Sequence, residues 1–526
     1  MRVLLGVVGS LIVLVAAAGA AQASTEGANL ASTTDAVSQL LVAAVIVGLF
    51  VVLALDKAHR VLVAFACLGL IWAITYLTPF HLLSFQTAHE SIDLNVIFLL
   101  AAMMALVGVL KTTNAFAWAV NKLLHHSGGR PGTAASLIIW FTGVLSALLD
   151  NVTTVIFAYP MASDMAKRMK INASAFLLPM VMAANIGGTA TLIGDPPNIL
   201  IGSGAGISFM EFIYNLSAPC GLMMFALVWY AKRYYPNDIG AGWKPSTGPG
   251  EDYGPTPKLH NVKLLKWILV ITLLIFVGFV TQQMTGMPAA VPAVIGVAAI
   301  LVLQDYYYLK AENPKHGERL HGILRLIESE IEWPTLAFFM FLFMIVGAAV
   351  ATGLIESVAH GLAWVIQAAG TAFGLGKLGT LLLAALIILW VSGFLSAVID
   401  NIPYVAVTIP LVANLIPTLG GGPESEVLWW ALSLGACLGG NGTLVGASAN
   451  VTVVGLAEKS GKHISFAEFT RFGARVTGIT LAISSIYLAL WLFVGGALVN
   501  WVLAGVVLAL VVLSRLARRR PAASPA

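Results

Sequence analysis

Charged residues and cysteines are scarce in this sequence. Only 10% of the 526 residues are charged and 59% are hydrophobic, whereas a soluble domain carries roughly 25% charged residues. The net charge of +4 is small, and no basic domain is present that would bind nucleic acid. The three cysteines (Cys67, Cys220 and Cys437) all lie in apolar segments. An odd set in such positions argues against a disulfide framework.

The sequence motifs of common enzymes are also missing. There is no G-x-x-x-x-G-K-[ST] loop for ATP, no H-E-x-x-H pair and no cluster of Cys and His for a metal. We therefore expect no enzyme and no cofactor, apart from a coupling ion, H⁺ and/or Na⁺. Two alternatives from other classes are an intramembrane aspartyl protease, which needs two acids facing each other on full spans, and a channel, which would lack gradient-coupled exchange.

Long apolar runs are abundant instead. Runs of about 20 apolar residues, the length that spans a bilayer, recur along the chain. They predict an all-α polytopic membrane protein with about 11 full spans in the mature chain. Lys57 and Arg60 are expected in a cytoplasmic loop, and the basic tail 515–520 puts the C-terminus in the cytoplasm. Asp93 and Glu332 lie near span ends, where surface acids are expected.

Residues 1–23 are expected to be a signal peptide. Arg2 precedes an apolar core, and "AQA" stands before Ser24 as a cleavage site. Cleavage implies a bacterial-type inner membrane and an external mature N-terminus. The alternative is an uncleaved first helix.

Three segments occur twice in the same order. "FTGVLSALLDN" (141–151) matches "VSGFLSAVIDN" (391–401), "GGTATLIGDPPN" (187–198) matches "GGNGTLVGASAN" (439–450), and "ISFMEF" (207–212) matches "ISFAEF" (464–469). The charge pattern of the flanking loops gives the two copies opposite orientations, which is typical of secondary transporters. The expected organisation is a first repeat unit at 37–235, a cytoplasmic linker at 236–263, a second repeat unit at 264–495, and a last span with its basic tail at 498–526.

Two apolar segments each carry an acid next to an amide. Segments 132–163 and 379–416 begin and end on the same side of the membrane by their flanking charges, so we expect re-entrant hairpins. Asp150-Asn151 and Asp400-Asn401 would lie at their tips. An acid at the bilayer centre costs about 3 kcal/mol or more, so it is read as functional by default. The alternative is a protonated acid bonded to neighbouring backbone.

Two further segments, 172–206 and 428–456, are expected to be broken transmembrane helices. Glycines and prolines permit the breaks, and the freed backbone groups are tolerated only beside protein or a wet cavity. The glycines and prolines at the predicted breaks are Gly187, Gly188, Gly194, Pro196, Pro197, Gly439, Gly440 and Gly446. The predicted ion- and substrate-binding residues are Asp150, Asn151, Thr153, Asn185, Thr189, Thr191, Asp195, Asn198, Asp400, Asn401, Asn441, Thr443, Ser448 and Asn450, with Na⁺ at the Asp150 and Asp400 sites. A single Gly, Ser or Thr in a membrane helix is more often a packing residue.

The paired "LDN" and "IDN" hairpins, together with "NIGGTATLIGDPPN", resemble the ion transporter superfamily in its arsenite-permease/NhaD branch, which includes P-protein-like and citrate-transporter-like permeases. The likeness covers residues 37–495. It implies a two-repeat permease that works by an elevator-like or rocking motion, and a homodimer. A soluble ATPase partner, as some arsenite permeases recruit, stays open, and the lipid bilayer is the other expected partner.

The expected function is secondary active transport, with two readings of the transported species, of which the first is favoured. In the first, Asp150, Asp195 and Asp400 bind Na⁺ (or Li⁺) and protons in alternation. In the second, they carry protons only and drive a small anion such as arsenite. Cys437, beside the second break, could bind arsenite but is more often a small apolar residue. A sodium/dicarboxylate symporter is disfavoured, because acids repel carboxylates and no Lys or Arg is expected at membrane depth to compensate.

Overall fold

The structure, a computed structural model, describes residues 32–519 apart from residues 56–57, 128–129, 243–257 and 313–326. The described residues form helices and connecting turns and contain no strand. The signal peptide expected at 1–23 and most of the linker expected at 236–263 lie outside them. The helices of the first part are α2 (Ala36–Ala54), α3 (Arg60–Leu77), α4 (Phe85–Glu90), α5 (Leu94–Thr112), α6 (Ala115–His125), α7 (Pro131–Ser146), α8 (Asn151–Arg168), α9 (Ser174–Thr189), α10 (Pro196–Ala205) and α11 (Phe209–Tyr234). Those of the second part are α12 (Val262–Val280), α13 (Gln282–Thr285), α14 (Ala290–Glu312), α16 (Trp333–Ala351), α17 (Leu354–Ala372), α18 (Lys377–Val398), α19 (Asn401–Thr418), η1 (Pro423–Glu426), α20 (Val427–Gly439), η2 (Leu444–Gly446), α21 (Ser448–Lys459), α22 (Phe466–Leu490), η3 (Trp491–Gly495) and α23 (Gly496–Arg519).

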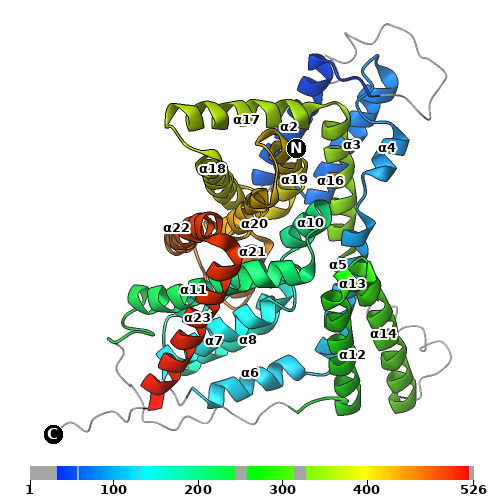
Figure 1. The fold of residues 1–526 in the computed structure, drawn as a ribbon. Coiled ribbons are helices and arrows are strands. Elements are labelled where there is room, and N and C mark those ends of the chain that lie inside the picture. Colours follow the sequence, from blue (N-terminus) through cyan, green and yellow to red (C-terminus); the bar gives the residue numbers. More distant parts are fainter. Residues whose placement is uncertain (1–31, 56–57, 128–129, 243–257, 313–326, 520–526) are drawn as a thin grey trace.

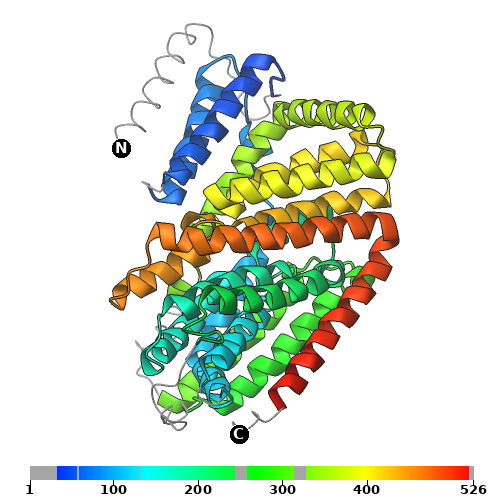
Figure 2. The same ribbon diagram turned by 90° about the vertical axis from the view of Figure 1, so that its left-hand side faces the viewer.

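Many of these helices are long and apolar enough to span a membrane. Ten such helices occur among the described residues, and the last, Phe466–Ser514, contains two of the expected spans. The chain changes direction between these two at the π-helical turn η3, where Gly495 has a φ of 103° (Figure 2). Large apolar side chains such as Leu273 and Trp501 are exposed on the outside of the bundle, as lipid-facing residues must be. The all-helical polytopic fold is thus confirmed.

The two parts of the chain contain the same local elements. Helices α7 and α8 form a hairpin that turns at residues 147–150, and α18 and α19 turn at 399–400. Helices α9 and α10 are the two halves of a broken helix, and so are α20 and α21. Each break is followed by a long helix with a serine N-cap and a glutamate three residues later, Ser208 with Glu211 in α11 and Ser465 with Glu468 in α22. The repeated sequence segments therefore fold alike.

Helices α9 and α20 form the centre of the protein, and every residue of both is buried. They come into backbone contact with the first arms of the hairpins. A Cβ atom on Gly187 would overlap the carbonyl group of Gly143, and one on Gly439 would overlap that of Gly393. Glycine is required at both crossings because no side chain fits between the helices. This close packing fixes the hairpin turns beside the helix breaks.

Two helices of the described chain that are longer than ten residues were not expected from the sequence. Helix α6 lies between α5 and the first hairpin, and α17 lies between α16 and the second hairpin. Both come directly after a candidate span, and α17 runs across one end of the molecule in Figure 1. Trp364 of α17 is 71% exposed. These helices link each hairpin to the preceding span.

Candidate functional site

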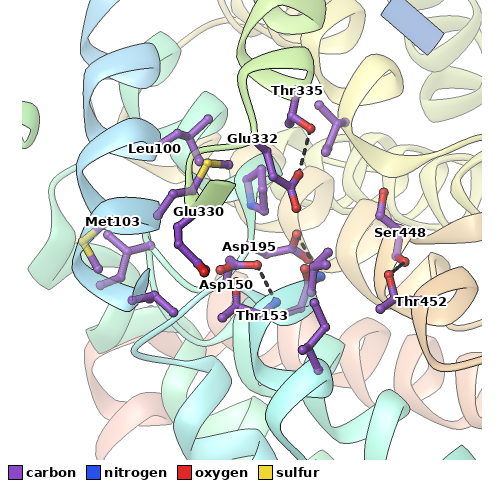
Figure 3. A pocket seen from close by; sticks show the side chains of 18 of the residues that line it. Leu100, Met103, Asp150, Thr153, Asp195, Glu330, Glu332, Thr335, Ser448 and Thr452 are labelled. Carbon is purple, nitrogen blue, oxygen red and sulfur yellow. Dashed lines mark hydrogen bonds between the residues drawn. The ribbon is translucent and has the colours of Figure 1, made fainter. Parts of the chain in front are cut away.

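A cavity of about 300 Å³ lies where the hairpin turns and the helix breaks meet (Figure 3). Its wall contains Asp150, Asn151 and Asp195 from the first part of the chain, and Asn401 and Ser448 from the second. Thr153 also lines it. The cavity therefore brings together six of the predicted binding residues, from both repeats, whereas Asp400 lines a neighbouring cavity.

Six helices begin at this cavity: α3, α8, α10, α16, α19 and α21. The N-terminus of a helix carries a partial positive charge and attracts anions and acidic side chains. Acids occupy four of the N-cap positions, namely Asp150 of α8, Asp195 of α10, Glu332 of α16 and Asp400 of α19. The helix ends thus help to stabilise carboxylates in an otherwise apolar protein.

The four acids differ in how they use their carboxylates. Asp150 accepts a hydrogen bond from the backbone N–H of Thr153 at 2.8 Å, and Asp400 accepts one from Ile402 at 3.3 Å. These two side chains cap their own helices. Asp195 and Glu332 make no such capping bond. Two of the three acids that the sequence suggested, Asp150 and Asp400, therefore also stabilise the helices that follow them.

The side chain of Asp195 does not cap α10. Pro196 and Pro197 have no N–H to donate, and the N–H of Asn198 donates to the backbone carbonyl of Asp195 at 2.9 Å. Its carboxylate is instead held by the two hairpin amides. Asn151 donates to Oδ1 at 3.3 Å, and Asn401 donates to Oδ2 at 3.5 Å. The residue is only 1% exposed. Asp195 is thus a buried carboxylate shared by both hairpins.

A chain of amides fixes the direction of the bond from Asn151 to Asp195. The NH₂ group of Asn450 donates to two backbone carbonyls at the second helix break, at 2.8 and 2.9 Å. Its oxygen therefore accepts, and Asn185 donates to it at 3.1 Å. The oxygen of Asn185 in turn accepts from Asn151 at 3.1 Å. Each amide orients the next, and Asn151 is left with its NH₂ group facing Asp195.

The other predicted polar residues at the breaks satisfy backbone carbonyls. Asn198 donates to the carbonyls of residues 188, 189 and 191, as Asn450 does at the second break. Thr191 donates to the carbonyl of Ala147, and Thr443 donates to that of Ala397. Thr189 bonds to the carbonyl of Asn185 within its own helix. These contacts supply partners that interrupted helices lack. Their assignment as ion ligands stays a prediction.

Asn441 lies behind the cavity wall. It is fully buried, its oxygen accepts from Asn185 at 2.9 Å, and its NH₂ group has no partner among the described residues. The predicted break residues Gly188, Gly194, Gly440 and Gly446 form matching backbone contacts in the two halves, Gly188 with Gly194 and Gly440 with Gly446.

The sequence reasoning missed a basic residue at this site. Arg60, expected in a cytoplasmic loop, begins α3 and lines the cavity. Its guanidinium lies 3.7 Å from the carboxylate of Asp400. The expectation that these acids have no basic partner is therefore wrong for Asp400. Nothing in the local sequence of Arg60 distinguishes it from a flanking loop residue, because its partner is hundreds of residues away.

Three more charged residues of the cavity were missed. Lys111 and Glu330 form an ion pair at 3.1 Å, and Glu332 accepts a hydrogen bond from Thr335 at 2.9 Å. Glu332 was expected at the surface, but its side chain faces the cavity with Asp150 and Asp195 in Figure 3. Among the described residues, no Lys or Arg lies within ion-pair distance of Asp150, Asp195 or Glu332. The cavity wall is acidic overall.

Residues 49–435 match the model of the CitMHS family, described as citrate transporter. The chain belongs to this family. Family membership confirms the resemblance to the ion transporter superfamily and shows that the protein is a membrane transporter rather than an enzyme.

Two of the following three relatives by sequence are named as transporters. An uncharacterized transporter of Mycobacterium tuberculosis is 35% identical over 86% of this chain and 98% of its own length. An uncharacterized transporter of Synechocystis is 30% identical over 85% of this chain and 96% of its own length. The P protein of Homo sapiens is 28% identical over 87% of this chain and 60% of its own length.

Solved structures support the fold. The YdaH transporter of Alcanivorax borkumensis matches with a TM-score of 0.54 at 15% identity, over 94% of this chain and 98% of its own. MtrF of Neisseria gonorrhoeae, described as one of a class of antimetabolite efflux pumps, matches with a TM-score of 0.51 at 13% identity, over 89% and 96% of the two chains. At these identities the likeness concerns the fold alone.

Proposed function

We propose that the protein is a secondary active transporter that exchanges protons for a monovalent cation, Na⁺ or Li⁺, with Asp195 as the carboxylate that the two ions share. The observation that carries this proposal is the position of Asp195. Its carboxylate is buried, is not used for capping, and is held between Asn151 and Asn401, one amide from each hairpin. A carboxylate in this position is in contact with both halves of the transporter, so its environment changes when they move relative to each other.

The charge balance of the cavity supports a cationic cargo. Of the acids that line it, Glu330 is paired with Lys111, whereas Asp150, Asp195 and Glu332 have no ion-pair partner in the described chain. Unpaired carboxylates in a low-dielectric site attract cations and protons strongly. No group of three acids, histidines or cysteines suited to a metal ion occurs among the described residues, so a small monovalent ion suits the site better than a tightly ligated divalent metal.

Competition of the two ions for one carboxylate is sufficient for exchange. A proton and a sodium ion compete for the same carboxylate, so binding one displaces the other. The hairpin amides contact Asp195 in either case, and the two halves of the protein rearrange around the loaded site to expose it to the opposite side. Placement in a bacterial inner membrane with a cytoplasmic C-terminus, and assembly as a homodimer, remain part of this proposal.

The second candidate function is the transport of a small anion coupled to protons. Arg60 in the cavity wall and the six converging helix N-termini favour it, since both attract negative charge. The family description as citrate transporter points in the same direction. In this case the carboxylates must bind protons before the anion enters, because their charges would repel it.

A flux assay in liposomes separates the two candidates. Purified protein is reconstituted in vesicles with an acidic interior and a pH-sensitive dye, and Na⁺, Li⁺, K⁺, arsenite and citrate are added outside in turn. Proton efflux on addition of Na⁺ or Li⁺, lost in Asp195→Asn and retained in the exposed control Glu424→Gln, is the expected result. A response to an anion without any response to cations would overturn cation exchange in favour of the second candidate.

A further inference from the structure

Asp150 and Asp400 occupy equivalent places in the two hairpins but have different surroundings. The residue that begins the second half of the broken helix is Pro196 in the first repeat and Ser448 in the second. The hydroxyl of Ser448 donates to Asp400 at 2.9 Å. Proline has no such donor, and the hydrogen bond that the structure gives the side chain of Asp150 comes from the backbone N–H of Thr153. The two acids are therefore not interchangeable.

Arg60 completes the surroundings of Asp400. Besides the carboxylate at 3.7 Å, its guanidinium donates to Ser448 at 3.2 Å and to Thr335 at 2.9 Å. These contacts fix the guanidinium between α16, α19 and α21. A positive charge at the first residue of α3 is unfavourable for the helix dipole. The contact with Asp400 offsets this cost, and each of the two side chains gains a partner of opposite charge.

The pair also lies between two cavities. A second cavity of about 330 Å³ is lined by His59, Arg60, Asp400 and Ser448, among others. Arg60 and Ser448 line both cavities, whereas Asp400 lines only the second. The guanidinium thus separates Asp400 from the cavity that contains Asp150 and Asp195.

We propose that Arg60 is a resident counter-cation of Asp400, which takes the place of a transported cation at the second hairpin. The transported ions are then confined to the Asp150 and Asp195 side of the cavity. The sequence agrees with this asymmetry, because the position equivalent to Asp195 in the second repeat is Ala447. The inference rests on the proposed cation exchange and specifies which of the repeated acids takes part in it.

The first test compares thermal unfolding of purified protein without transported cations, so it does not depend on transport. The variants are Arg60→Gln, Asp400→Asn and the double variant, with Lys377→Gln, Glu424→Gln and their double variant as the control pair, which is exposed and 4.0 Å apart. We expect the Arg60/Asp400 double variant to unfold about 3 °C or more above the sum of the single effects, and the control pair to be additive within about 1 °C. Additive effects at Arg60 and Asp400 would overturn the proposal.

The second test measures cation-driven proton flux in liposomes. Asp400→Asn leaves Arg60 without its partner beside the cavity, so we expect at least a ten-fold loss. The double variant is expected to recover at least ten-fold over Asp400→Asn with the wild-type Na⁺:H⁺ ratio, and Arg60→Lys to retain exchange. A folded double variant as inactive as Asp400→Asn would refute the resident-cation role while leaving cation exchange intact. A wild type without cation-driven flux would refute the exchange itself, and the unfolding data would still decide whether the two charges are coupled.

Discussion

Asn151 donates its amide to Asp195 over 3.3 Å, and the direction of this bond is set in the other half of the protein. Asn450, anchored on backbone carbonyls of the second helix break, orients Asn185, which orients Asn151. Asp195, the carboxylate on which the proposed exchange depends, is therefore coupled to the second repeat through buried amides. A change in the packing of the two repeats would alter the hydrogen bond that Asp195 accepts from Asn151.

The first prediction concerns Asn185, the central amide of this chain. Asn185→Ala removes the acceptor of one N–H of Asn151 and the donor to the oxygens of Asn441 and Asn450, which costs about 1–3 kcal/mol of stability. It also frees Asn151 to turn away from Asp195, so we expect the apparent affinity for Na⁺ to fall about ten-fold. Unfolding temperature and flux titration in liposomes measure the two effects.

A matched control for this variant is Asn215→Ala. Asn215 lies in a separate buried cluster, where Trp491 and Asn500 donate to its oxygen at 2.9 and 3.0 Å. We expect a similar loss of stability and an unchanged Na⁺ affinity. An equal loss of affinity in both variants would show that the effect is global and that the amide chain has no special link to the site.

The second prediction concerns the ion pair of Lys111 and Glu330. Both side chains are partly exposed, at 49% and 27%, so the pair adds little stability, about 1 kcal/mol or less. Lys111→Gln removes a positive charge from an acidic cavity. We expect the KM for Na⁺ to fall about three-fold at low ionic strength and the effect to fade above roughly 0.3 M salt. A KM that rises, or that changes equally at all salt concentrations, would contradict an electrostatic role.

Much of the fold was predictable from the sequence. The apolar runs, the repeated "DN" pairs and the Gly- and Pro-rich breaks are local signals, and the helices that they predicted are present. Helices α6 and α17 were missed because they are not needed to cross a membrane and follow directly on longer apolar runs. Local hydropathy does not separate such helices from their neighbours.

The site was predictable only in part. The acids and amides stood out because polar residues are rare in this sequence. The sequence does not show which of them cap helices and which hold Asp195, because these roles depend on contacts between distant segments. Arg60 meets Asp400 across more than 300 residues of chain, and Glu332 faces the cavity only because α16 begins there. No periodicity or spacing in one sequence encodes such pairs.

The third prediction concerns the helix crossings. A Cβ on Gly187 or Gly439 would overlap the carbonyl of Gly143 or Gly393, so either Gly→Ala change must push two central helices apart. We expect a loss of about 3 kcal/mol or more and little folded protein after purification. Gly48→Ala is the control, because a Cβ there meets no atom within 4 Å. Size-exclusion profiles and unfolding temperatures of the three variants provide the comparison, and wild-type behaviour of Gly187→Ala would show that the crossing is looser than described.

The last prediction uses a difference between the two helix breaks. The hydroxyl of Thr191 donates to the carbonyl of Ala147 at 2.6 Å and also accepts from the backbone N–H of Gly194 at 3.1 Å. The hydroxyl of Thr443 donates to the carbonyl of Ala397, and the structure gives it no bond from Gly446. Valine has nearly the same shape and removes only the hydroxyl. We expect Thr191→Val to cost about 2 kcal/mol and Thr443→Val about 1 kcal/mol, because each lost bond leaves a buried backbone group unsatisfied. Unfolding of the two variants under identical conditions measures the difference. A larger loss for Thr443→Val would mean that the second break, beside Arg60 and Asp400, depends on its hydroxyl more than the hydrogen bonds indicate.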